Sequence, residues 1–374
     1  MIAAAQPIQR PRDAKLLVVG ARGCVTHAPR SRVVDFLRPA DLVIANDAAT
    51  LPASLHGTHL PTGAEIEVRL AGRPSLAAAD VHAFSAVIFG AGDFRTRTED
   101  RPPPPPLAPG DQLVLGSASS GVARPFCATV DALLDHPRLV LLRFGGSPHE
   151  VWEGLARYGR PIQYTHMTTP LAMWDVWTPI AAVPVAFEPP SASFALNFGA
   201  IQAMRERGIA FATITLAAGI SSTGDPVLDR RLPFDEPYRI SATTASAIRD
   251  AHARGGRIVA VGTTVVRALE HAAAADGVVP AGSGIANQRI GRSSRLKIVD
   301  AILSGTHEPG SSHYEMLRAF LDDHTLAAAT AALEARGYRT HEFGDSVLIE
   351  RKARSSNGAA GANNWREGRV PTAA

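Results

Sequence analysis

A turn rich in glycine and threonine is the segment of the chain best suited to bind an anion. Gly262, Thr263 and Thr264 follow a β-branched strand and open a helix. The first N–H groups of a helix lack intrahelical partners and can hold a carboxylate or a phosphate. Arg267 and Glu270 follow on one face of that helix, and a guanidinium group also suits an anion. Physical chemistry alone favours a plainer interpretation, a common strand–turn–helix with a threonine cap and a surface ion pair.

The elements that must hold this turn follow two different patterns. Between residues 57 and 145, short apolar runs are separated by Gly, Pro and charged turns, which indicates an all-β module. From residue 191 onward, strands alternate with helices, as in a parallel sheet or barrel. We therefore predict a parallel-type, barrel-like α/β main domain (1–56 and 150–350), an inserted all-β domain (57–149) and a disordered basic tail (351–374).

Apolar runs place the individual elements. Strands are expected at 16–19, 42–45, 66–70, 86–89, 113–115, 139–143, 211–216, 257–261, 296–303 and 346–349. Helices are expected at 193–207, 243–254, 264–275, 312–321 and 325–336. The main domain should therefore contain both element types, with the helices in its second part.

Composition narrows the class of protein. The 374 residues, 45% of them hydrophobic, can bury at least one large core. No apolar run is long enough to span a membrane and the first residues lack a secretory pattern, so we expect a cytoplasmic protein. Cys24 and Cys127 have no CxxC spacing, so neither a metal site nor redox chemistry is predicted. The basic tail accounts for the net charge of +3, so global charge does not favour nucleic-acid binding.

The turn at 262–264 belongs to the string GTTVVRALE, which resembles the GTTSVRALE motif of the S-adenosylmethionine:tRNA ribosyltransferase-isomerases of queuosine biosynthesis. Other segments resemble motifs of that family in the same order. They are 12–17 (RD(S/A)RLL), 37–47 (LRPGDLLVxND), 297–309 (KVVDALLTNFHLP) and 343–345 (SYGDAMLI). The likeness spans residues 10–350 and is weakest between 57 and 160, where the family carries an inserted β-barrel. It implies that the all-β module is a barrel.

Several polar positions of these motifs are changed. The family's NDTRV, APTAGLHF, TLHVGLGTF and HxMHxE correspond here to 46–50 (NDAAT), 188–195 (EPPSASFA), 215–223 (TLAAGISST) and 231–236 (RLPFDE). A threonine, an arginine and the histidines of these motifs are therefore missing. The chain resembles a divergent member whose scaffold is preserved better than its polar lining.

The resemblance implies an enzyme that moves the ribosyl part of S-adenosylmethionine to the 7-aminomethyl-7-deazaguanine base of tRNA. Adenine and methionine leave, and epoxyqueuosine forms. S-adenosylmethionine would be a co-substrate and tRNA a partner, with no metal, no other cofactor and no membrane. We expect a monomer, although the sequence leaves the oligomeric state open.

The reaction needs a base for the proton next to the sulfonium, a donor for the leaving adenine, and contacts that hold both substrates. We predict His307, which lies in a family motif, and Asp47 as catalytic residues. Predicted substrate contacts are the carboxylate site Gly262, Thr263, Thr264 and Arg267, the strand-end residues Asn46 and Asp345, and the base contacts Gln163 and Tyr164, which resemble part of the family's YQTVYA element. Each also has a plain structural interpretation as a turn, cap or core residue.

Two alternatives remain. A divergent paralogue would bind S-adenosylmethionine or a related nucleoside and use another acceptor, which the missing histidines and arginine would permit. A non-catalytic RNA-binding protein would keep only the scaffold and the basic tail, and its affinity for RNA would depend on salt.

Overall fold

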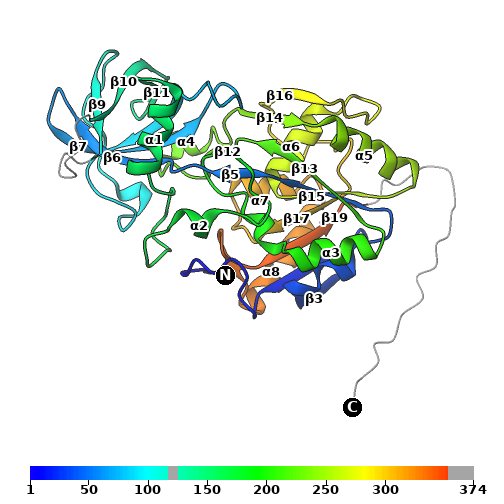
Figure 1. Cartoon of the computed structure of the whole chain (residues 1–374). Helices are drawn as coiled ribbons and strands as arrows, with labels where there is room; N and C mark the ends of the chain where they lie inside the picture. Colours follow the sequence, from blue (N-terminus) through cyan, green and yellow to red (C-terminus); the bar gives the residue numbers. More distant parts are fainter. Residues whose placement is uncertain (117–124, 353–374) are drawn as a thin grey trace.

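A closed barrel and an open sheet form the two ends of the molecule (Figure 1). The computed structural model describes residues 1–116 and 125–352. The predicted disordered tail lies, from residue 353 onward, outside these residues. The strands of the barrel all come from one stretch of chain, 54–144, so the barrel interrupts the larger unit.

The barrel consists of six antiparallel strands in the closed order β10-β11-β8-β7-β6-β9. They are β6 (Ser54–His59), β7 (Ala64–Gly72), β8 (Ala83–Phe89), β9 (Gln112–Leu115), β10 (Phe126–Leu133) and β11 (Leu139–Phe144). Side chains such as Val68, Phe84 and Leu142 are fully buried, which is expected of a small barrel whose interior is packed. The expectation of a β-barrel is confirmed.

The larger unit is built on a sheet of nine strands in the order β16-β14-β13-β4-β15-β17-β19-β2-β3. They are β16 (Gly282–Ala286), β14 (Glu236–Ile240), β13 (Ala210–Leu216), β4 (Leu42–Asn46), β15 (Ile258–Val261), β17 (Ala301–Gly305), β19 (Ser346–Glu350), β2 (Lys15–Val19) and β3 (Val25–Pro29). The central strands β13, β4, β15 and β17 are mutually parallel, whereas β14 and β16 on one side and β19 and β3 on the other introduce antiparallel pairs. The sheet is thus mixed and open, and the predicted parallel, barrel-like form is wrong in that respect.

The physical reason lies in the chain connections. The connection from β13 to β15 is long and includes α4, β14 and α5, so the two strands can run parallel. In contrast, β2 and β3 are joined by a short turn that reverses the chain. Two further small sheets are parallel pairs, β1 (Ile2–Ala3) with β18 (Arg339–Thr340) and β5 (Ala48–Thr50) with β12 (Val183–Ala186). The second pair lies between the barrel and the large sheet (Figure 1).

Apolar residues cover both faces of the large sheet. Leu17 and Ile44 belong to one buried cluster, and their neighbours Leu16 and Val43 belong to another. Strands buried on both faces form continuous apolar runs in the sequence, which is why the sequence places β4, β13 and β15 correctly. The first cluster continues into the barrel, so the two units share a core.

Helices contact both units: the one at Pro148–Tyr158 packs against β6 of the barrel, and others pack against strands of the large sheet. The helices are α1 (Pro148–Tyr158), α2 (Met173–Val176), α3 (Phe198–Glu206), α4 (Pro226–Asp229), α5 (Ala242–Ala253), α6 (Thr263–Ala272), α7 (Ser312–Leu317) and α8 (Asp323–Ala335). The helix expected at 193–207 begins as a 3₁₀ turn, Ser191–Ala195, and becomes α3 only at Phe198. The strand expected at 296–303 is displaced to β17.

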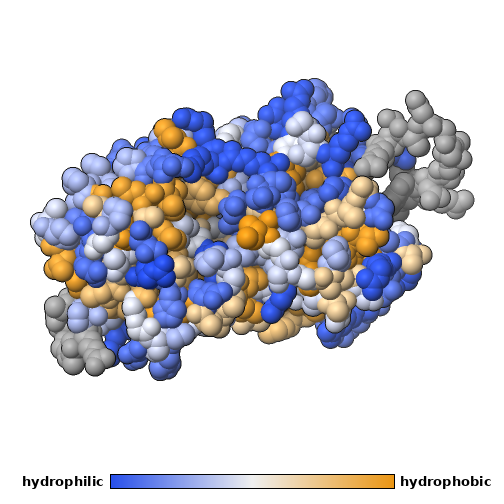
Figure 2. Space-filling view, turned by 90° about the horizontal axis from the view of Figure 1, so that it is seen from above, coloured by the Kyte–Doolittle hydropathy of each residue, from blue (hydrophilic) through white to orange (hydrophobic). Residues whose placement is uncertain are grey.

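Hydrophilic and hydrophobic residues are interspersed over the face drawn in Figure 2, as on most water-exposed protein surfaces. None of the described helices has the length and the hydrophobicity that crossing a membrane requires.

Candidate functional site

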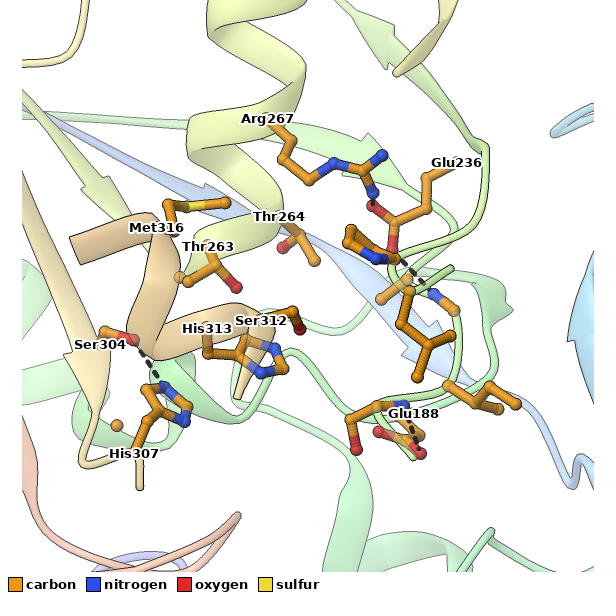
Figure 3. Close-up of a pocket in the computed structure, with 18 of the residues that line it drawn as sticks. Glu188, Glu236, Thr263, Thr264, Arg267, Ser304, His307, Ser312, His313 and Met316 are labelled. Carbon is orange, nitrogen blue, oxygen red and sulfur yellow. Dashed lines mark hydrogen bonds and ion pairs between the residues drawn. The ribbon is translucent and has the colours of Figure 1, made fainter. Parts of the chain in front are cut away.

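A pocket of about 290 Å³ opens at the carboxyl ends of β13, β15 and β17 (Figure 3). Ligands of open α/β sheets usually bind at this edge. The polar residues that line the pocket are Glu188, Ser191, Ser221, Asp229, Arg230, Glu236, Thr263, Thr264, Arg267, Arg289, Ser304, His307, Ser312, His313 and Glu315.

The turn between β15 and α6 forms one wall of this pocket. Gly262 has a φ of 95°, a left-handed conformation that favours glycine, and its N–H donates to the carbonyl of Leu303 at 2.8 Å. The chain therefore passes directly from the strand into the helix, next to β17. Thr263 and Thr264 line the pocket at the first turn of α6, where unpaired N–H groups and the positive end of the helix dipole favour an anion.

Arg267 and Glu236 form a buried ion pair at the pocket wall (Figure 3). Their side chains are 2% and 4% exposed. Arg267 also donates to the carbonyl oxygens of Phe234, Ala286 and Gln288. The N–H groups of Arg267 therefore already donate to protein groups, and through these bonds the guanidinium holds the pocket wall in place.

Other cations and the helix terminus are better placed to meet an anionic ligand. Arg230 and Arg289 are exposed residues that line the pocket rim. Together with the first turn of α6 they give this side of the pocket a positive potential. Asp229 and Glu315 contribute carboxyl groups to the same pocket, so it presents groups of both signs.

His307 lies in the pocket and is paired with a second histidine. Its Nε2 is 3.1 Å from Oγ of Ser304, and its ring stacks on His313 with a centroid distance of 4.6 Å. Burial, and then the charge of His313, lower the pKa of His307 well below its usual range. His307 is therefore a neutral imidazole at physiological pH and can accept a proton.

Glu188 is a buried carboxyl group on the opposite side of the pocket. It is 8% exposed, and its Oε1 accepts hydrogen bonds from the Tyr164 hydroxyl at 2.5 Å and from the Ser221 N–H at 3.1 Å. Burial, and then the negative charge of Glu342, raise the pKa of Glu188 to about 7, against the effect of these hydrogen bonds. Glu188 can therefore hold or release a proton near neutral pH.

Tyr164 connects Glu188 to a second, smaller cavity. This cavity, of about 10 Å³, is lined by Tyr164, Gln163 and Glu188, among others. Burial and the charge of Glu188 raise the pKa of Tyr164 well above its usual range, so its hydroxyl remains a donor. Gln163 holds its own loop, because its amide donates to the carbonyl of Thr169 and accepts from the N–H of Leu171.

Two predicted substrate contacts, Asn46 and Asp345, and the predicted catalytic residue Asp47 lie outside the pocket. Asn46 bonds to the N–H and the carbonyl of Leu216, and Asp47 accepts from the hydroxyls of Thr213 and Thr215. Both join the end of β4 to β13. Asp345 accepts from the backbone N–H groups of residues 15 and 339, where it ties β2 to the turn before β19.

The structure therefore divides the predicted site residues into three groups. Gly262, Thr263, Thr264, Arg267 and His307 meet in the pocket; Gln163 and Tyr164 line the adjoining small cavity; Asn46, Asp47 and Asp345 belong to neither.

Sequence reasoning missed Glu188, Glu236 and His313. An acidic residue directly after the apolar run 183–187 was a usable signal for Glu188, because such runs are often buried strands. Glu236 stands where the family's HxMHxE motif carries its glutamate, which was also a usable signal. His313 gave no local signal, since only the fold pairs it with His307.

An open α/β sheet with a polar pocket at its strand ends, joined to a barrel, defines the class of protein, and comparison with known proteins defines its family. The family model described as "Queuosine biosynthesis protein" matches residues 1–349. Proteins named S-adenosylmethionine:tRNA ribosyltransferase-isomerase are similar over nearly the whole chain. The one from Moorella thermoacetica is 30% identical over an alignment that covers 92% of this chain and 95% of its own length. The one from Sorangium cellulosum is 32% identical, and the alignment covers 92% of this chain and 94% of its own length. This chain belongs to the queuosine biosynthesis protein family.

A third relative of the same name, from Pelobacter propionicus, is 31% identical over 91% of this chain and 94% of its own. A crystal structure of the S-adenosylmethionine tRNA ribosyltransferase from Thermotoga maritima aligns with 93% of this chain and 96% of its own, with a TM-score of 0.48 and 22% identity.

Proposed function

We propose that this chain transfers the ribosyl group of S-adenosylmethionine to tRNA and isomerises it, with 7-aminomethyl-7-deazaguanine as the acceptor base and epoxyqueuosine as the product. The name shared by relatives that align over more than nine tenths of the chain supports this activity. The observation that carries the proposal is the pocket itself, which combines an anion site with two proton-transfer groups.

S-adenosylmethionine would bind with its methionine carboxylate at the first turn of α6. Thr263 and Thr264 offer hydroxyls there, and the rim residues Arg230 and Arg289 add positive charge. The carboxyl groups of the pocket suit the cationic sulfonium and amino groups of the same molecule. Arg267 would act indirectly, because it positions the wall from which α6 presents its first turn.

The two proton-transfer groups have pKa values displaced in opposite directions. A neutral His307 would remove the proton from the carbon next to the sulfonium, and a protonated Glu188 would supply a proton to the departing adenine. In many enzymes the surroundings of two titratable groups separate their pKa values, so that one group acts as the acid and the other as the base at the same pH. Methionine and adenine would leave as the ribosyl group is transferred to the aminomethyl nitrogen.

A different acceptor remains a second candidate because two motif positions are changed close in the chain to Ala192 and Ala218, which line the pocket. Phe194 and Ala217 stand where the family's motifs carry histidine. Both are buried, and Phe194 stacks on Phe343 with a centroid distance of 5.4 Å. Loss of two imidazoles near the substrates would alter which acceptor is used without removing the pocket.

The test is incubation of the purified chain with S-adenosylmethionine and tRNA that carries the aminomethyl-deazaguanine base, with adenine release followed by chromatography. We expect release that depends on tRNA and that His307→Ala lowers by about 10²–10⁴-fold, the usual contribution of a general base. His324→Ala is the matched control, since His324 is exposed on α8.

The outcomes separate the candidates. Absence of adenine release, together with measurable binding of S-adenosylmethionine, would overturn the transferase assignment and favour a different acceptor. Tight tRNA binding without binding of S-adenosylmethionine would favour a non-catalytic RNA-binding protein.

A further inference from the structure

Three potential metal ligands converge outside the pocket. His166, His341 and Glu342 each offer one ligand atom, and these atoms lie within 4.8 Å of one another. Nε2 of His166 is 3.0 Å from a carboxylate oxygen of Glu342, and the rings of His166 and His341 stack with a centroid distance of 4.2 Å. None of the three lines the larger pocket.

We propose that His166, His341 and Glu342 bind one divalent first-row transition metal ion, with zinc as the best match. Two imidazoles and one carboxylate are a ligand set that zinc sites with an open coordination position use, whereas Mg²⁺ and Ca²⁺ prefer oxygen ligands. Metal bonds of about 2.0–2.2 Å bring ligand atoms to within about 3.5 Å of one another. The three ligand atoms lie within 4.8 Å of one another, so metal binding would draw them closer together and turn the two stacked imidazole rings toward the ion.

The backbone holds both ligand segments in place. His166 lies in a turn in which the N–H of Met167 donates to the carbonyl of Tyr164 at 3.1 Å. His341 lies between β18 and β19, in a turn closed by a 3.0 Å hydrogen bond from the N–H of Gly344 to the His341 carbonyl. A pre-formed pair of turns reduces the ordering that metal binding would otherwise require.

The conformation of His341 is a second independent observation. Its φ of 68° is a left-handed conformation that histidine adopts uncommonly, and residues in such conformations cluster at functional sites. His341 is an exposed residue, yet its ring stacks on His166 and does not point into the surrounding water.

The surroundings are suited to a cation and give it access to a ligand. The carboxyl groups of Glu188 and Glu308 interact electrostatically with the cluster, Glu188 with Glu342 and Glu308 with His341. The side chains of His166 and Glu342 are 12% and 21% exposed, and both line the small cavity beside Tyr164. A metal ion there would have an open side for water or another oxygen or nitrogen ligand.

This site differs from the expectation drawn from the sequence, which contains no metal motif. His166 and Glu342 are 176 positions apart in the chain, so local spacing cannot predict a site that forms only in the folded protein. The proposal does not depend on the ribosyl transfer, and its test uses binding alone.

The test is titration of the purified, chelator-treated full chain with Co²⁺, followed by absorption, and with Zn²⁺ in competition with a chromophoric chelator. We expect one ion per chain. His341→Asn should weaken binding by at least about a hundredfold, because even outer residues of metal sites contribute about 10–100-fold. Asparagine tolerates a positive φ, so this variant should fold.

Glu342→Gln should also weaken binding, whereas the surface control His324→Ala should bind like the parent protein. Zn²⁺ should raise the Tm of the parent and leave that of His341→Asn unchanged, because a ligand stabilises only the state that binds it. Absence of binding by the parent, or equal affinity of the parent and His341→Asn, would overturn the proposal.

Discussion

The Tyr164 hydroxyl donates a 2.5 Å hydrogen bond to Oε1 of Glu188, and this contact links the segment that follows α1 to the pocket at the ends of the central strands. The carboxyl group is buried, and burial raises its pKa to about 7. Its protonation state is therefore the feature of the site most open to experiment.

Replacing Glu188 by a side chain that cannot release a proton should reduce the rate of catalysis more than the affinity for S-adenosylmethionine. Glu188→Gln keeps the size of the side chain and an oxygen that can accept from Tyr164, but it cannot give up a proton. We expect tRNA-dependent adenine release to fall by about 10²–10⁴-fold while the Kd for S-adenosylmethionine changes little. Glu334→Gln, an exposed position on α8, serves as the control. Equal losses in binding and in turnover would show that Glu188 only shapes the pocket.

The pH dependence of the rate should follow Glu188. As an acid, Glu188 must carry its proton, so kcat should fall as pH rises through about 7, the folded-state pKa of this carboxyl group. Burial lowers the pKa of His307 well below its usual range, so His307 stays neutral as pH rises above 7. Glu342 and Arg69 are the charged groups that act on Glu188 from neighbouring segments. A kcat profile from pH 5.5 to 9 checks this, and Glu188→Gln should flatten the alkaline limb.

The pair Arg267–Glu236 should be essential for stability. Arg267→Met leaves Glu236 as a buried carboxylate without its partner, and such a change typically costs about 3–5 kcal/mol. Urea denaturation monitored by circular dichroism measures the free energy of unfolding. The double variant Arg267→Met with Glu236→Leu should lose less than the single one, since no charge remains buried. Arg32→Ala, in an ion pair 63% and 46% exposed, should change stability by less than about 1 kcal/mol.

A side chain at position 262 should destabilise the protein, although there is space for a Cβ atom there. A Cβ at this position would lie 3.5 Å from the Cβ of Ala192, an ordinary contact, so the cost of Gly262→Ala comes from its φ of 95°. We expect a loss of about 1–2 kcal/mol and weaker binding of S-adenosylmethionine, because strain would displace the first turn of α6. Thermal unfolding and calorimetric binding check both effects. Gly145→Ala is the control, since a Cβ there meets open space. Unchanged binding would place the carboxylate site elsewhere.

Local patterns in the sequence carry much of the fold. Interior strands such as β2 and β4 are continuous apolar runs because both faces of the sheet are covered, so these runs locate them in the sequence. Shorter or more polar strands escaped prediction, such as β6, which contains two histidines, and β14, which contains a proline. Their place in a sheet depends on neighbours that are distant along the chain.

The amino-acid sequence by itself determined the strand–turn–helix of the pocket, the barrel insertion and the family, because each rests on residues that are neighbours in the chain. The tertiary structure alone decided what the polar groups do. It engaged Arg267 with Glu236, placed Asn46, Asp47 and Asp345 in strand-joining hydrogen bonds, and brought Glu188 into the pocket. The physical reason is that burial, charge pairing and pKa depend on three-dimensional proximity, which the separation of residues along the chain does not reveal.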